Sequence, residues 1–147
     1  QGGRVSRITT IHPKSYEDAQ LVGRAIRDGI PVVLNLTDGQ STDGDPRPAA
    51  EALRELASTD GNVLLFNLHV SSEGGKPTIF PGASADLNDE YARTLFSMSS
   101  ALPSHMRAYA AQQGIAVDDT SRGFVYNADM ITIVQFLDIG TRATDLR

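Results

Sequence analysis

Two almost entirely apolar runs constrain the fold of this chain more than any other feature. They are Ile30–Leu36 and Val63–Val70, and each is rich in Val, Leu or Ile. A strand that is apolar on both faces needs cover on both sides, which is typical of the interior of a parallel sheet. Amphipathic patterns with helical spacing flank these runs. The sequence therefore predicts a three-layer α/β fold, in which helices cover both faces of a mainly parallel sheet.

The remaining elements predict a single domain over residues 1–147, a length that suits one compact unit. A strand is predicted over 5–11 and a helix over 15–29, and another helix begins at Asp45-Pro46. Further along, the patterns predict an edge strand over 78–80, helices over 89–102 and 104–114, a strand over 123–127 and a helix over 128–139. In that last helix the spacing places four apolar side chains inward: Met130, Ile133, Val134 and Leu137.

Charge and composition exclude several classes of function. The formal net charge is −5 and no basic run is present, so neither nucleic acid nor an anionic membrane is an expected partner. Cys is absent, which excludes disulfides, thiolate metal sites and a thiol nucleophile. No apolar run is long enough to enter a membrane as a span, and no signal peptide is recognisable, so a cytoplasmic location is expected. Neither a G-x-S-x-G elbow nor a P-loop is present, and no enzymatic activity is predicted.

The segment after the first apolar run is dense in oxygen-bearing side chains. Six hydroxyl or carboxylate groups fall within nine residues there. Ligands of open α/β sheets gather beyond the carboxyl ends of strands, and hard oxygen ligands suit Mg²⁺, Mn²⁺ or Ca²⁺. Asp38 is therefore the first candidate metal ligand, with Thr37, Ser41 and Asp43 beside it. The alternative is structural, because Asp38-Gly39 favours a turn and Asp45-Pro46 favours a helix start.

Most of the chain carries one family resemblance. The residues that carry it read "PVVLNLTDGQSTDGDP" (31–46), "GNVLLFNLHVSS" (61–72), "YARTLFSMSSALP" (91–103) and "RGFVYNAD" to "FLDIGT" (122–141). Over about 31–147 the chain resembles the C-terminal half of a bacterial von Willebrand factor A (VWA) domain. The resemblance implies a Rossmann-like, doubly wound fold that binds an acidic group of a partner protein through Mg²⁺ at a metal-ion-dependent adhesion site.

That site is incomplete in this sequence. Asp38, in Thr37-Asp38-Gly39, matches one of the three ligand loops of the family, and no D-x-S-x-S motif exists anywhere in the chain. The first functional expectation is therefore a non-enzymatic cytoplasmic VWA-like interaction module, with a protein partner of unknown identity and Mg²⁺ as its one candidate cofactor.

The N-terminal stretch carries a second resemblance. Residues 4–37, "RVSRITTIHPKSYEDAQLVGRAIRDGIPVVLNLT", closely resemble the opening β-α-β of SepF from actinobacteria. SepF links the FtsZ polymer to the membrane during cell division, so the resemblance implies an alternative function as a dimeric division factor that binds FtsZ and supports septum assembly. The two resemblances overlap on 31–37, where both families have a buried strand, which suggests a join at shared sequence.

Overall fold

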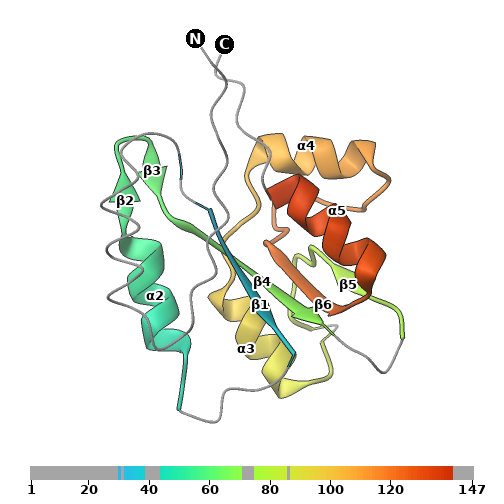
Figure 1. Ribbon diagram of the computed structural model, residues 1–147, viewed down its shortest axis with the longest axis horizontal. Helices are drawn as coiled ribbons and strands as arrows, with labels where there is room; N and C mark the ends of the chain where they lie inside the picture. The colour runs from blue at the N-terminus through green and yellow to red at the C-terminus, as the bar shows by residue number, and fades with distance from the viewer. Residues whose placement is uncertain (1–29, 31, 39–43, 71–74, 86, 141–147) are drawn as a thin grey trace.

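A computed structural model describes residues 30, 32–38, 44–70, 75–85 and 87–140 (Figure 1). Within these residues the chain forms a four-stranded sheet, a two-stranded hairpin and four helices. The main sheet contains, in spatial order, β1 (Val32–Thr37), β4 (Leu64–Val70), β6 (Phe124–Ala128) and β5 (Thr78–Ile79). The hairpin consists of β2 (Ala57–Ser58) and β3 (Gly61–Asn62). The helices are α2 (Arg47–Glu55), α3 (Glu90–Met98), α4 (Ser104–Gln112) and α5 (Met130–Gly140). The predicted strand over 5–11 and helix over 15–29 lie outside the described residues.

The main sheet is mostly parallel, as the apolar runs predict. Strand β4 pairs in parallel with β1 on one side and with β6 on the other. Strand β5 is the short antiparallel edge strand predicted over 78–80, and it pairs with β6. The central strand β4 is therefore paired along both edges, which satisfies its backbone hydrogen-bonding groups.

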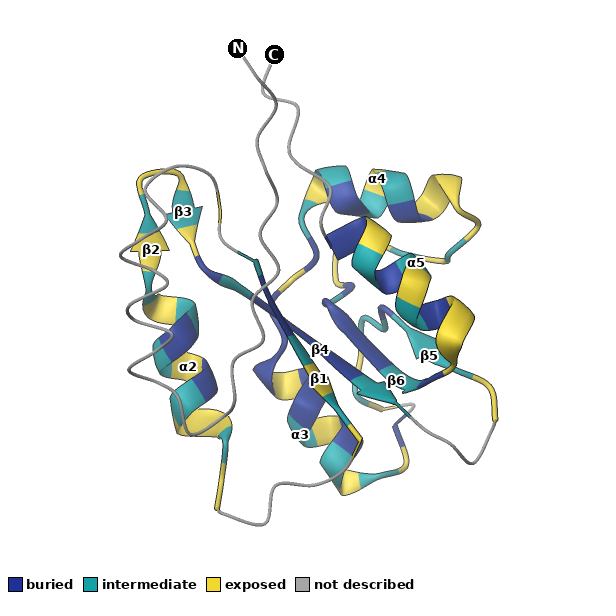
Figure 2. Cartoon of the chain, in the orientation of Figure 1, coloured by how far each residue is buried: buried dark blue, intermediate teal, exposed yellow. Residues whose placement is uncertain are grey.

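The two faces of the sheet are covered by different pairs of helices. Val33 and Leu65 point to one face, where they pack with the buried residues of α2 and α3. Their chain neighbours Leu34 and Phe66 point to the other face and pack with α4 and α5. This alternation follows from the two-residue period of a strand. Figure 2 shows the buried strands between these two sets of helices, so the expected three-layer arrangement holds for the described residues.

The rotation of α5 differs from the prediction. Met130 and Val134 were expected to face inward, yet they are 73% and 59% exposed, respectively. Phe136 is buried instead, and its ring packs against the rings of Phe66 and Phe80 at centroid distances of 6.3 and 6.0 Å. One large aromatic side chain at the centre of the core fixes the phase of the helix, because it buries more apolar area than the aliphatic side chains it displaces. Asp129 caps the helix, accepting from the Thr132 backbone N–H at 2.8 Å.

Helix α3 is shorter than the predicted helix over 89–102. It ends at Met98, and Ser99 already has extended backbone angles. Beyond it, Ser100 bonds to strand β4, donating its backbone N–H to the Leu65 carbonyl at 2.7 Å and accepting the Leu65 N–H on its Oγ at 2.9 Å. These two bonds to the sheet replace the hydrogen bonds that another helical turn would supply.

A buried polar network joins the centre of the sheet to the end of α3. Asn67 of β4 is completely buried and accepts from the Asn35 side-chain amide of β1 at 2.9 Å. Its own amide donates to the Ser99 hydroxyl at 2.9 Å and to the Leu95 carbonyl at 3.4 Å. Because buried polar groups are costly unless paired, this network favours one placement of α3 on the sheet.

Candidate functional site

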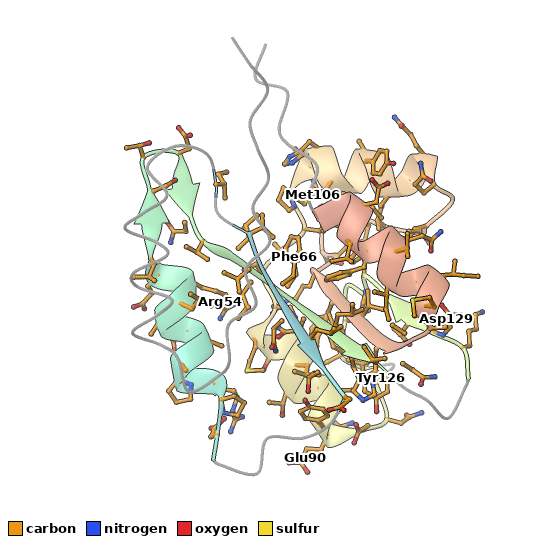
Figure 3. All side chains as sticks on the ribbon, in the orientation of Figure 1. Arg54, Phe66, Glu90, Met106, Tyr126 and Asp129 are labelled. Atoms are coloured by element: carbon orange, nitrogen blue, oxygen red, sulfur yellow. The ribbon has the colours of Figure 1, made fainter. Side chains whose placement is uncertain are left out.

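The carboxyl ends of the parallel strands bring together a group of polar and aromatic side chains. Thr37 ends β1 and lies opposite His69 of β4 in the strand register. Tyr126 comes from the adjacent strand β6, and the amino end of α3 adds further members. Figure 3 shows Tyr126 at this end of the sheet and Glu90 at the start of α3. We call the following residues the carboxyl-edge cluster: Thr37, Asp38, His69, Asp89, Tyr91 and Tyr126.

Three aromatic rings form the centre of the cluster. The His69 ring stacks on the Tyr126 ring, with centroids 4.4 Å apart and planes inclined by 15°. The Tyr91 ring meets His69 edge-on, at 6.1 Å and 78°. All three side chains are half-buried. Part of the aromatic surface therefore remains accessible from outside the sheet.

Hydrogen bonds hold the two tyrosines in place. The Tyr91 and Thr37 hydroxyls lie 3.0 Å apart and share a hydrogen bond. The Tyr126 hydroxyl donates to the Asp89 carboxylate at 2.9 Å. Asp89 also caps α3 by accepting the Ala92 backbone N–H at 3.3 Å, so one carboxylate fixes both the helix start and the Tyr126 ring.

His69 is held as a neutral imidazole. Its Nδ1 accepts the backbone N–H of Asn127 at 3.2 Å, which places the ring proton on Nε2. Burial lowers the pKa of His69, while the charges of Asp89 and Asp38 act in the opposite direction. Asn127 itself has a φ of 61°, in the left-handed region that residues other than glycine adopt rarely. The bond to His69 helps to support that backbone turn at the end of β6.

The tyrosines of the cluster stay protonated at neutral pH. Burial raises the pKa of Tyr91, and the Asp38 and Asp89 charges raise it further, whereas the hydrogen bond with Thr37 lowers it. Burial also raises the pKa of Tyr126, together with its hydrogen bond to Asp89. With neutral rings and two carboxylates, the cluster has negative charge at its border.

The predicted metal ligands are only partly described by the structure. Thr37 is committed to Tyr91, and Asp38 is an exposed residue at the end of β1. Ser41 and Asp43 lie outside the described residues. Within the described ranges, no group of three or more His, Asp or Glu side chains is placed to hold a metal ion. Mg²⁺ binding at Asp38 therefore stays a prediction.

The sequence did not indicate the whole cluster. His69, Tyr91 and Asp89 belong to no recognisable site motif, so the sequence alone does not single them out. Tyr126 carried no signal except its position near the end of a predicted strand. That position was informative, because the carboxyl ends of neighbouring parallel strands meet at one edge.

None of the helices in the described part of the chain combines the length and apolarity that a membrane span requires. Comparison with known proteins shows similarity to one family over part of the chain. The family model for cell division protein SepF matches residues 8–57. No solved structure matches the chain significantly.

Several curated proteins named cell division protein SepF match parts of the chain. The protein from Bifidobacterium adolescentis is 50% identical over 88 residues, which cover 60% of this chain and 49% of the relative. That from Bifidobacterium animalis subsp. lactis is 88% identical over 34 residues, 23% of this chain and 22% of the relative. The protein from Paenarthrobacter aurescens is 43% identical over 67 residues, which cover 46% of this chain and 32% of the relative. The chain spans about half the length, or less, of these relatives.

These matches correct the first functional interpretation. The VWA-like module with a metal-ion-dependent adhesion site is wrong, because the comparisons support SepF and give no support for a VWA domain. The SepF resemblance also extends further than residues 4–37, since the family match continues to residue 57 through β1 and α2. The short "TDG" motif after β1 is weak alone, because both candidate families have a buried strand before it.

Proposed function

We propose that this chain is a cell-division factor of the SepF type, which binds FtsZ and supports septum assembly. The family match over residues 8–57 carries the proposal, and the names of the matching relatives agree with it. The role is that of a non-enzymatic adaptor in the cytoplasm, acting through contacts with other proteins.

The exposed apolar side chains of the matched segment support a protein-binding role. Ile30 and Leu36 lie at the start and near the end of the β1 region, and they are 42% and 54% exposed. Each of these two side chains leaves apolar surface that a partner protein would cover on binding. A second copy of the chain or the FtsZ tail would bury them.

The test is co-sedimentation of the purified chain with polymerised FtsZ, with FtsZ lacking its C-terminal peptide as the control. We expect the chain to sediment with intact polymers and to stay in the supernatant with the truncated ones. Equal sedimentation with both, or with neither, contradicts the proposal.

Two variants locate the binding surface. Leu36→Asp places a charge inside the family-matched segment, and Ile131→Asp places the same charge on α5, outside it, where Ile131 is 72% exposed. We expect Leu36→Asp to reduce co-sedimentation and Ile131→Asp to leave it unchanged. The melting temperatures of both variants, measured alongside, show whether each still folds.

A further inference from the structure

The charged groups that act on the carboxyl-edge cluster in the described residues are all negative. In the described part of the chain, the charged groups that act on His69 and Tyr91 are the carboxylates of Asp38 and Asp89. His69 cannot offset them while its Nδ1 accepts from the Asn127 N–H. Arg47, at the start of α2, is paired with Asp45 through bonds of 2.9 to 3.1 Å, so its charge is already compensated.

The cluster also has unused binding capacity. Asp89 accepts from Tyr126 and caps α3, whereas Asp38 lies exposed at the strand end. The half-buried rings of His69, Tyr91 and Tyr126 lie on the same edge of the sheet. A negatively charged border beside aromatic rings attracts cations and repels carboxylates.

We propose that the carboxyl-edge cluster binds an arginine side chain presented by a partner peptide, with Asp38 accepting from the guanidinium and the tyrosine rings packing against it. A guanidinium fits both features, since it is planar, stacks on aromatic rings and donates two parallel hydrogen bonds to one carboxylate. This chain already places one guanidinium over an aromatic ring, because Arg122 lies 4.7 Å from the centroid of the Phe96 ring. The proposal does not depend on the division role.

Arginine suits the cluster better than a metal ion does. Mg²⁺ requires near-octahedral oxygen coordination, and Asp89 and Thr37 are already engaged by Tyr126 and Tyr91. An arginine side chain needs only one free carboxylate and an aromatic surface. A single arginine derivative lacks the other contacts that a whole peptide would make. We therefore expect such a small compound to bind weakly, with a dissociation constant in the millimolar range.

The test is a titration of the ¹⁵N-labelled chain followed by two-dimensional NMR. The probe is Nα-acetyl-arginine-N-methylamide, and the matched control is the citrulline analogue, which has the same shape without the charge. We expect saturable shifts of the His69, Tyr91 and Tyr126 amides with arginine and much weaker ones with citrulline. Equal affinity for the two compounds would overturn the proposal.

Variants separate a specific contact from general attraction. We expect Asp38→Asn to weaken arginine binding about fivefold, and Asp119→Asn, which removes an exposed carboxylate before the amino end of β6, to leave it unchanged. Tyr126→Leu should weaken binding by a similar factor. Equal weakening by Asp38→Asn and Asp119→Asn contradicts the proposal, as does saturation of the same amides by MgCl₂ at lower concentration than the arginine probe.

Discussion

The buried amide of Asn67 allows a quantitative prediction about how α3 is seated on the sheet. Replacing it by Asp retains the shape and still accepts from Asn35, but it removes the donations to Ser99 and Leu95. Two lost hydrogen bonds cost about 1–3 kcal/mol. A carboxylate buried without a cationic partner, beside the Leu95 carbonyl, brings the total loss to about 3–5 kcal/mol at neutral pH.

Replacement of Asn67 by Leu is the matched control. It has a similar volume, and it leaves no buried donor unpaired, because the Ser99 hydroxyl still donates to the Leu95 carbonyl at 2.7 Å and Asn35 is only half-buried. We expect Asn67→Leu to lower the free energy of unfolding by less than about 1.5 kcal/mol.

The two variants should also differ in their pH dependence. Burial without a partner raises the pKa of a carboxyl group at position 67 in the folded state, so the folded chain binds this proton more tightly than the unfolded chain. The loss of unfolding free energy caused by Asn67→Asp therefore becomes smaller as the pH falls, while the loss caused by Asn67→Leu does not. Urea unfolding followed by circular dichroism at several pH values measures both. If the Asp variant is as stable as the Leu variant at pH 7.5, the proposed network does not stabilise the fold.

Three further predictions follow from particular contacts. Gly123→Ala should lower the free energy of unfolding by about 1–3 kcal/mol in urea titrations, because a Cβ there would overlap the buried Phe66 ring. Folding lowers the pKa of His69, so the unfolded chain binds the imidazole proton more tightly than the folded chain does. The free energy of unfolding should therefore fall as the pH drops below about 6.5. His69→Gln should reduce this pH dependence in the same urea titrations. If Mg²⁺ binds at Asp38, added MgCl₂ raises the melting temperature of the chain, and Asp38→Asn abolishes this rise. An equal rise in the original chain and in the Asp38→Asn variant contradicts Mg²⁺ binding at Asp38.

The sequence predicts the sheet well because its central strands have a strong local signal. A strand such as β4 is apolar at five of its seven residues, and only a covered position in a sheet accommodates that pattern. The edge strand β5 follows equally from the turn residues around it.

The features that the sequence did not predict depend on contacts between distant residues. The phase of α5 is set by Phe136 against Phe66, 70 positions away in the chain, and aliphatic spacing within the helix cannot reveal it. The hairpin β2–β3 has two-residue strands, too short for any periodic pattern. The carboxyl-edge cluster unites residues from β1, β4, α3 and β6, so only the strand order identifies its members.

The choice between the two families shows the same limitation. The stretch "LNLTDG" predicts a buried strand followed by a turn, and both families meet that requirement. Local pattern therefore gives the fold class at this point and leaves the function open. The family match over residues 8–57 supports SepF at this point, because it includes the strand, the turn and the segments on either side of them.

The most direct test of the division role is a calorimetric titration of the purified chain with a synthetic FtsZ C-terminal peptide, with a scrambled peptide of the same composition as control. We expect saturable binding of the FtsZ peptide and none of the scrambled one. Absence of saturable heat with the FtsZ peptide, from a chain shown to be folded by its melting curve, would contradict the proposed SepF-type function.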